Sequence, residues 1–307
     1  MTESNEFNSQ SYNSHSDHYK DYAPGGEKEQ HSKTWFEADT VDAWRHKRMY
    51  SALDPILNAE PDAKWLTVGD GRYGTDAKYI LDQGVDAVAS DISDLLLKEA
   101  QSAGFISQFS RQNAESLTFK NSEFDYVLCK ESFHHFPRPF IALYEMLRVA
   151  TKGVVLIEPN DRFYPHSFTR YLFTSAIRMV ISFFSKGGSR HTFEESGNYV
   201  YSISKREIEK AALGMNYGTI AFKGCNDFYQ YGAEFEKISS NGKIYKKIRS
   251  RIKLLDVLTK LNLLDYGMLA VVIFKIKPSE NLINNLQQDG FEVIDLPKNP
   301  YVGKSGP

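Results

Sequence analysis

The sequence has few cysteines. Only two of its 307 residues are cysteines, Cys129 and Cys225, and each lies in an apolar context. Two isolated cysteines do not form a disulfide framework, and no group of residues has the spacing of a zinc site. We therefore expect neither structural disulfides nor a bound metal.

Long hydrophobic runs are also lacking. No stretch approaches the roughly 20 apolar residues that span a bilayer, and the first residues lack the apolar core of a secretory signal. The most apolar stretch, 171–184, is short and is interrupted by Arg178. We expect it to form a helix over an active site or a subunit interface, with membrane docking as the alternative. These absences predict a cytoplasmic protein without stable membrane insertion.

Neither sign of charge dominates. The net charge of −2 disfavours a general nucleic-acid-binding protein. One local exception lies in residues 243–253, where an apolar helical stripe is flanked by basic residues. This pattern is typical of a solvated helix face, and the alternative is attraction of an anionic substrate or membrane surface. The basic residues are Lys243, Lys246, Lys247, Arg249, Arg251 and Lys253.

A hydrophobic period is missing from residues 1–33. This segment is rich in Ser, Asn, His, Asp and Glu. Such a composition predicts a disordered N-terminal tail. A lid segment that is ordered by substrate is the alternative.

Apolar stretches alternate with helical patterns from residue 40 onward. This alternation of strand and helix patterns predicts an α/β fold with a doubly wound, mostly parallel, seven-stranded sheet. We place one domain at 34–277, helical insertions after the fifth and sixth strands at 161–203 and 226–264, and a C-terminal extension at 278–307. The expected strands are 65–68, 86–91, 105–109, 124–129, 153–160, 217–222 and 267–276, and the extension adds a short helix and a strand at 290–296. An amphipathic helix or helix pair is expected at 40–57, before the first strand, and the capping box Ser204-Lys-Arg-Glu207 starts another helix.

The first strand runs into a glycine-rich turn, Gly69-x-Gly71-x-x-Gly74. Glycine tolerates positive φ and lets a backbone approach a ligand closely, and the N-terminus of the following helix offers free N–H groups. This pattern alone is as typical of a simple tight turn as of a binding loop.

The second expected strand ends on Asp91, seventeen residues after Gly74. At this spacing an acidic residue accepts hydrogen bonds from the hydroxyls of a ribose. The alternative is that Asp91 is the N-cap of the next helix.

These features belong to a longer series of landmarks between Trp65 and Pro159, with which the chain resembles the class I S-adenosylmethionine-dependent methyltransferases in their small-molecule, type 11-like branch. The resemblance implies a Rossmann-like fold and S-adenosyl-L-methionine as cofactor. The landmarks are Val68-Gly-Asp-Gly-x-x-Gly74, Asp91, Asn113-Ala-Glu-x-Leu-x-Phe119, Phe124-Asp-Tyr-Val-Leu128, His134-His-Phe136, Glu145-Met-Leu-Arg-Val149 and Ile157-Glu-Pro159.

The resemblance also implies roles for individual residues. Gly69 and Gly71 would approach the methionine and ribose parts of the cofactor, and Asp91 would hold the ribose. Asn113 would face the adenine amino group, and Ala114 would offer a backbone N–H to the adenine ring. Lys130 and Glu131 would line the methionine end.

The glycine-rich turn departs from the family pattern at two positions. Thr67 stands where the family often has an acid that contacts the methionine amino group, and Asp70 is the candidate for that contact. The third glycine, Gly74, comes one residue later than usual.

Three side chains are candidates for a catalytic base, namely His134, His135 and Glu158. They follow the fourth and fifth strands, where ligands bind in such sheets, and histidine suits proton transfer at neutral pH. The alternative for either histidine is that it caps the following helix or packs against it.

The expected reaction is methyl transfer to a small molecule, to oxygen rather than nitrogen, with a sugar or a nucleotide-linked sugar as acceptor. The Asn/Asp-Pro-Pro-aromatic signature of enzymes that methylate base nitrogens is missing. Two other functions stay open. An NAD(P)-dependent oxidoreductase shares the glycine loop but does not explain Asn113-Ala-Glu115, and a non-catalytic protein that binds the cofactor is the third hypothesis. Association into a homodimer also stays open.

Overall fold

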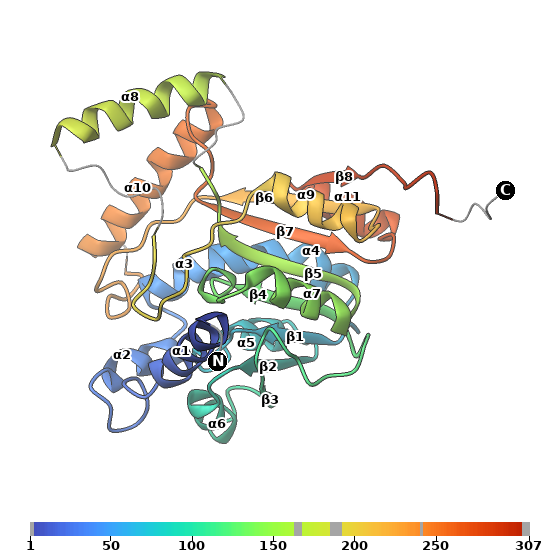
Figure 1. Cartoon of the computed structure of the whole chain (residues 1–307). Coiled ribbons are helices and arrows are strands. Elements are labelled where there is room, and N and C mark those ends of the chain that lie inside the picture. Colours follow the sequence, from blue (N-terminus) through green and yellow to red (C-terminus); the bar gives the residue numbers. More distant parts are fainter. Residues whose placement is uncertain (1–2, 163–167, 185–191, 240–241, 303–307) are drawn as a thin grey trace.

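The computed structural model describes residues 3–162, 168–184, 192–239 and 242–302, and an eight-stranded sheet forms its centre (Figure 1). The strand order is β3-β2-β1-β4-β5-β7-β6-β8. Neighbouring strands from β3 to β5 are parallel, whereas β7 is antiparallel to β5 and β6, and β8 is antiparallel to β6. The strands are β1 (Trp65–Val68), β2 (Ala87–Asp91), β3 (Gln108–Arg111), β4 (Phe124–Lys130), β5 (Ala150–Pro159), β6 (Thr219–Cys225), β7 (Met268–Phe274) and β8 (Glu292–Asp295).

The predicted α/β class with a mostly parallel sheet is confirmed, with eight strands in place of seven. The eighth strand comes from the C-terminal extension, where α11 (Glu280–Gln288) precedes β8. The third strand also lies later than predicted, at Gln108–Arg111. Phe105 and Ile106 supplied its apolar signal, but they pack on the core from the loop before it.

Both faces of the sheet are covered by helices. In β7, Leu269, Val271 and Ile273 belong to one apolar cluster, whereas Met268, Ala270, Val272 and Phe274 belong to the other. This alternation follows from the two-residue period of a strand, and a strand buried on both faces is apolar throughout. One face packs on α4 (Asp54–Ala59), α5 (Thr75–Asp82), α6 (Leu95–Ser102) and α11, and the other on α7 (Pro139–Val149) and α9 (Lys205–Gly214).

Local signals explain several helix boundaries. The predicted helix pair before β1 is present as α3 (Val41–Tyr50) and α4, and the Thr40 hydroxyl caps α3 by accepting from the N–H of Ala43. The predicted capping box before α9 is present, because Ser204 and Glu207 each accept from the other's backbone N–H.

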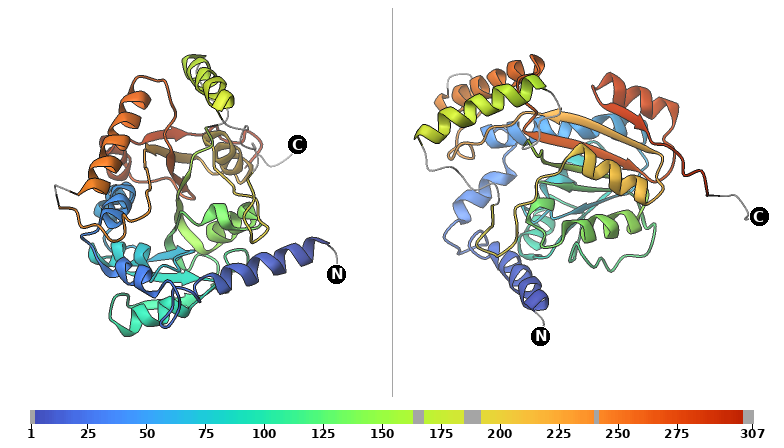
Figure 2. Two further views of the ribbon diagram at one scale, coloured as in Figure 1. Left: turned by 90° about the vertical axis from the view of Figure 1, so that its left-hand side faces the viewer. Right: turned by 45° about the horizontal axis from the view of Figure 1, so that its top comes forward.

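The first residues do not form the predicted disordered tail. Residues 3–36, which we call the N-terminal segment, contain α1 (Glu3–His18) and α2 (Glu29–Lys33) and lie against the domain (Figures 1 and 2). A few anchors hold the segment, such as the Tyr12 hydroxyl that donates to Glu115 at 2.6 Å. Tyr19, Tyr22 and Trp35 pack on the core. Because these contacts are made by isolated residues, they produce no hydrophobic period and could not be predicted from the sequence pattern.

Two insertion helices project from the domain. They are α8 (Phe168–Phe184) and α10 (Lys243–Lys260), and they stand apart from the sheet in Figures 1 and 2. In the described part of the chain, no helix combines the length and the apolar character needed to cross a membrane.

Candidate functional site

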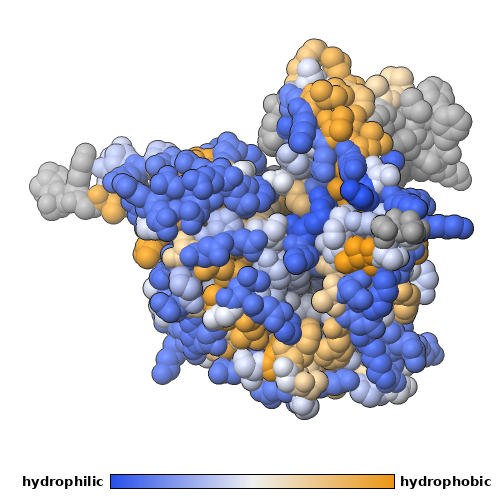
Figure 3. All heavy atoms as spheres, turned by 180° about the vertical axis from the view of Figure 1, so that it is seen from behind, coloured by the Kyte–Doolittle hydropathy of each residue, from blue (hydrophilic) through white to orange (hydrophobic). Residues whose placement is uncertain are grey.

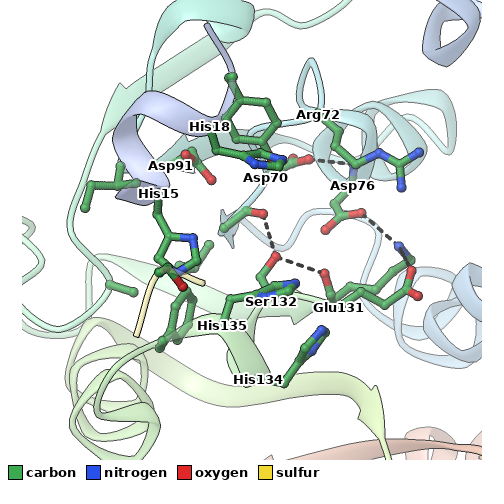
Figure 4. Close-up of a pocket in the computed structure, with 18 of the residues that line it drawn as sticks. His15, His18, Asp70, Arg72, Asp76, Asp91, Glu131, Ser132, His134 and His135 are labelled. Carbon is green, nitrogen blue, oxygen red and sulfur yellow. Dashed lines mark hydrogen bonds and ion pairs between the residues drawn. The ribbon is translucent and has the colours of Figure 1, made fainter. Parts of the chain in front are cut away.

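A cavity of about 910 Å³ lies beside the ends of β1, β2 and β4. Its floor comes from the turn after β1, from Asp91 and from residues 130–137, and its opposite wall comes from the N-terminal segment and α3. Figure 4 shows His15, His18 and Asp91 on one side and Arg72, Asp76 and Glu131 on the other. Nine of the predicted site residues line it, namely Gly69, Asp70, Asp91, Asn113, Ala114, Lys130, Glu131, His134 and His135.

The three glycines of the turn have different roles. Gly69 and Gly74 have φ of +79° and +71°, which non-glycine residues rarely adopt. Gly71 lacks a positive φ and instead allows a close approach, since a Cβ atom there would lie 2.2 Å from Cε2 of Tyr19. The sequence predicts that Gly71 approaches the cofactor, and in the structure the nearest neighbour of this glycine is Tyr19 of the N-terminal segment.

Asp70 caps the first turn of α5. Its carboxylate accepts from the backbone N–H groups of Asp76 at 3.0 Å and Ala77 at 2.9 Å. It also accepts from the Thr67 hydroxyl at 2.7 Å, so three of its about four acceptor positions are occupied. Burial, together with the neighbouring Asp76 carboxylate, raises the pKa of Asp70 well above its usual range. These bonds explain Thr67, which supplies a donor to Asp70, and they weaken the prediction that Asp70 binds an amino group.

Asp91 ends β2 at the edge of the cavity. It accepts from the N–H of Ser93 at 2.8 Å. Burial raises the pKa of Asp91 to about 7, because the backbone N–H groups of Ser93, Gly71 and Ile92 only partly offset the loss of water. The N-cap of α6 is Asp94, so the alternative that Asp91 caps this helix is wrong.

The loop after β3 is held by Glu115. The Asn113 side chain accepts from the N–H of Glu115 at 3.0 Å, which occupies part of the acceptor that we assigned to adenine. The Glu115 carboxylate accepts from the Arg138 backbone N–H at 2.6 Å and from Tyr12 of α1. This link between the loop and the N-terminal segment carried no signal in the sequence.

A charged network fills the end of the cavity near β4. Nζ of Lys130 lies 2.9 Å from Nδ1 of His46 and 2.9 Å from the Glu131 carboxylate. Arg72 donates to Asp42 at 3.1 Å. The contribution of α3 to the cavity was not predicted, although the basic residues that interrupt its apolar pattern were a signal for it.

Opposite charges set the protonation states in this network. Burial alone would raise the pKa of Asp42, but His46, Arg72 and Arg45 outweigh it and hold the pKa well below its usual range. In the same way Lys130 and His46 lower the pKa of Glu131. Burial, and then Lys130, lower the pKa of His46. The network therefore favours ionised carboxylates, whereas burial and Lys130 disfavour the protonated form of His46.

One buried donor of the network is unpaired. Among the described residues, Nε of Arg72 has no hydrogen-bond partner. The guanidinium of Arg72 also lies over the ring of Trp35, 4.5 Å from its centroid. A buried, unpaired donor is costly, so Arg72 is suited to an anionic ligand group in this cavity.

His134 and His135 form a short 3-10 helix, Phe133–His135, directly after β4. Nδ1 of His134 lies 2.6 Å from the Glu158 carboxylate, and Nδ1 of His135 lies 2.6 Å from that of Glu194. Burial would lower the pKa of His134, but the charge of Glu158 outweighs it and raises the pKa. The N-cap of α7 is Arg138, so neither histidine caps this helix.

Glu158 is not a base at the cavity surface. It is fully buried and is not among the described residues that line the cavity. Its carboxylate accepts from the N–H groups of Ser132 and Phe133, both at 2.9 Å, as well as contacting His134. Our prediction of Glu158 as a catalytic base is therefore corrected, because the side chain instead positions His134.

The insertions contribute a few side chains to the cavity. They are Phe193, Glu194, Glu195 and Ser196 from the first insertion and Tyr229 and Glu234 from the second. None of the basic residues at 243–253 is among the described cavity-lining residues. The basic cluster therefore does not serve this site.

The family model described as a methyltransferase domain matches residues 66–157 of this chain. No curated protein matches the sequence. Magnesium protoporphyrin IX methyltransferase from Synechocystis PCC 6803, solved with bound SAH, is 14% identical, with a TM-score of 0.44 and coverage of 75% of this chain and 84% of that one. A SAM-dependent methyltransferase from Archaeoglobus fulgidus is 13% identical, with a TM-score of 0.45, and the match covers 74% of this chain and 92% of that one. A SAM-dependent methyltransferase from Methanosarcina mazei is 16% identical, with a TM-score of 0.44, and the match covers 72% of this chain and 95% of that one.

Proposed function

Since residues 66–157 form a class I S-adenosylmethionine-dependent methyltransferase domain, we propose that this enzyme methylates a small molecule, at oxygen rather than nitrogen. S-adenosylmethionine is the cofactor, and it supplies an electrophilic methyl group on a sulfonium. The rest of the catalysis consists of alignment of the acceptor, exclusion of water and removal of a proton.

The residues of the cavity fit this cofactor. Asp91 is a buried carboxylate with a pKa near 7, so two ribose hydroxyls would supply the donors that stabilise its ionised form. Asn113 and Ala114 line the same cavity and would face the adenine. Arg72, with its unpaired Nε, and Lys130 suit the carboxylate of the methionine part.

We assign the base to His134. An acceptor hydroxyl must lose its proton during methyl transfer, and a histidine near neutral pKa removes it efficiently. Glu158 binds Nδ1 of His134, which leaves Nε2 as the atom that takes the proton. His135, paired with Glu194, is more exposed and is the second candidate.

The size and lining of the cavity support a polar acceptor beside the cofactor. Small-molecule sites occupy about 300–1,000 Å³, and this cavity lies near the upper limit. Ser14, His15, Glu194 and Ser196 offer hydrogen-bonding groups, and Phe193 offers an aromatic face. These groups suit a hydroxylated acceptor such as a sugar. Because the basic cluster lies elsewhere, a nucleotide-linked sugar has less support than a free one.

The observation that carries the proposal is that His134, held by Glu158 behind it, lines the same cavity as Asp91. Calorimetry with S-adenosylmethionine, S-adenosylhomocysteine and NADH tests the cofactor. Incubation with a panel of hydroxylated and amino acceptors, followed by mass spectrometry for one added methyl group, tests the reaction. We expect binding of the two sulfur compounds and methylation of a hydroxylated acceptor.

The other outcomes separate the rival functions. Binding of NADH alone would favour an oxidoreductase and overturn the proposal. Binding of S-adenosylmethionine with no product across the panel would favour the non-catalytic binding protein. Products methylated only at nitrogen would overturn the choice of oxygen.

A further inference from the structure

The helices α8 and α10 form an exposed surface that the cavity does not use. Among the described side chains on and just after these helices, seven large apolar ones are exposed to solvent, from 49% for Leu254 to 74% for Phe168. Figure 3 shows apolar atoms beside strongly hydrophilic ones on the projecting part of the molecule. The seven side chains are Phe168, Tyr171, Leu172, Met179, Leu254, Val257 and Leu261.

The apolar residues share one face of each helix. On α8, the exposed apolar residues follow Phe168 at intervals of three, four and eleven positions, which places all of them on one side of the helix. They are Tyr171, Leu172 and Met179. Leu254, Val257 and Leu261 have spacings of three and seven, which continue one stripe along α10 and just past its end. The spacing thus produces two apolar stripes rather than scattered exposed residues.

The stripe on α10 changes character along the helix. Lys243 and Lys247, in the first half of the helix, lie on the same face as Leu254 and Val257 in the second half. The helix as a whole has seven basic residues and a single acidic one, Asp256, in a chain whose net charge is −2. The positive charge is therefore concentrated beside the exposed apolar surface.

Both helices are attached to the domain by their other contacts. Ile248 and Ile252 of α10 are buried against Val41 of α3. The start of α8 is tied to the end of α10, since the Thr169 hydroxyl donates to the carbonyl of Asn262 at 3.1 Å, and Arg170 forms an ion pair with Asp265. The apolar stripes thus belong to an anchored surface of the protein.

We propose that α8 and α10 bind the surface of an anionic membrane. Helices that lie in a membrane interface have an apolar face flanked by Lys and Arg, and each basic residue adds attraction to acidic lipids. Such binding requires no helix long enough to cross the bilayer. Since α3 supports α10 and also supplies Arg45 and His46 to the cavity, membrane binding places the cavity close to the lipid surface. This inference goes beyond the proposed function and does not depend on the acceptor.

Co-sedimentation of the full chain with vesicles tests the proposal. The vesicles are phosphatidylcholine with and without phosphatidylglycerol. We expect binding to the anionic vesicles at least about tenfold stronger than to the neutral ones. The charge variant Lys243→Glu/Lys247→Glu should lose binding, and the apolar variant Leu254→Ser/Val257→Ser/Leu261→Ser should weaken it by about tenfold or more.

Matched controls change the same properties elsewhere. Lys98→Glu/Lys210→Glu alters the charge equally on α6 and α9, and Leu95→Ser/Ile141→Ser/Tyr144→Ser removes exposed apolar side chains from α6 and α7. Both controls should bind vesicles as the unaltered chain does. S-adenosylhomocysteine binding, measured by calorimetry, monitors folding of every variant and is independent of lipid. A variant that fails this check is replaced by Lys243→Gln/Lys247→Gln or by Val257→Ser alone.

Three results would overturn the proposal. The first is no binding to either vesicle, and the second is binding that neither variant weakens relative to its control. The third is a dimer that the apolar variant converts to a monomer, with no binding to anionic vesicles, since a second copy of the chain then covers the surface.

Discussion

The ring of Tyr19 lies directly on Gly71. A Cβ atom at this glycine would come within 2.2 Å of Cε2 and 2.6 Å of Cζ of the tyrosine. The contact joins the N-terminal segment to the turn after β1, at the edge of the cavity.

Gly71→Ala should displace the N-terminal segment. Because an added methyl group would overlap the Tyr19 ring, the ring must leave its place and the packing of the segment weakens. We expect faster proteolysis and faster hydrogen exchange in residues 3–36 than in the unaltered chain. Gly214→Ala is the control, since no atom lies within 4 Å of a Cβ there. Equal protection of residues 3–36 in both variants would contradict the contact, and Tyr19→Ala combined with Gly71→Ala should relieve the overlap.

Asp91 should link cofactor binding to pH. Its folded pKa of about 7 lies above the unfolded value of about 3.9, so the protonated carboxyl stabilises the cofactor-free protein. This contribution is fully present below about pH 4 and is lost as the pH rises through 7. Ribose hydroxyls favour the ionised form, so binding of S-adenosylhomocysteine near pH 7 should release a proton. Calorimetry in buffers of different ionisation enthalpy measures this release.

Asp91→Asn is the matched variant for this measurement. It keeps a side-chain oxygen acceptor but cannot ionise, so proton release should disappear and the affinity should fall. The unfolding temperature of the variant minus that of the unaltered chain should increase from pH 4 to pH 8, because only the unaltered chain loses the contribution of protonated Asp91. A difference in unfolding temperature that does not vary with pH would mean that Asp91 titrates with an ordinary pKa.

Glu158→Gln should shift the pH profile of catalysis. The carboxylate raises the pKa of His134, so a neutral amide should lower that pKa and move the acidic limb of the kcat profile to lower pH. NMR titration of the histidine ring measures the same shift without turnover. His134→Asn should reduce kcat by about 10²- to 10⁴-fold, the usual contribution of a general base.

Glu194→Gln is the control for the Glu158 variant, because Glu194 contacts His135 instead. If His135 is the base, His135→Asn reduces kcat and His134→Asn does not. Glu158→Ala is less informative, since it leaves the buried N–H groups of Ser132 and Phe133 without their acceptor, at about 1–3 kcal/mol each.

Arg45→Met should destabilise the whole domain. Arg45 is buried between the carboxylates of Asp42 and Asp227, and its removal leaves Asp227 without this partner and leaves Arg72 as the remaining arginine beside Asp42. The expected loss in the free energy of unfolding is about 3–5 kcal/mol, measured by chemical denaturation. Arg206→Met removes an exposed pair with Glu209 and should cost about 0–1 kcal/mol. A similar cost for both variants would show that the Arg45 pair contributes little.

Patterns within one element were predictable from the sequence. The apolar strands, the capping box at Ser204 and the position of Asp91 at the end of β2 each depend on neighbouring residues, and the structure contains all three. The histidines after β4 were also placed correctly at the cavity, because the carboxyl ends of parallel strands meet at one edge of a sheet.

Contacts between distant segments were not predictable. Arg45 meets Asp227 across 182 residues, and Tyr12 meets Glu115 across 103. Neither partner has a local pattern that marks it. Glu158 was misassigned for a related reason, since a carboxyl group at the end of a strand can point into the cavity or back toward the turn, and only the packing decides.

The two outer strands of the sheet limit how copies of this chain can associate. β3 and β8 each have four residues, and their end residues Gln108, Arg111, Glu292 and Asp295 are exposed and polar. Short strands with charged ends resist pairing with the strand edges of other molecules. Self-association by extension of the sheet, including aggregation through its edges, is therefore disfavoured. Any homodimer of this chain has to form through helices or loops.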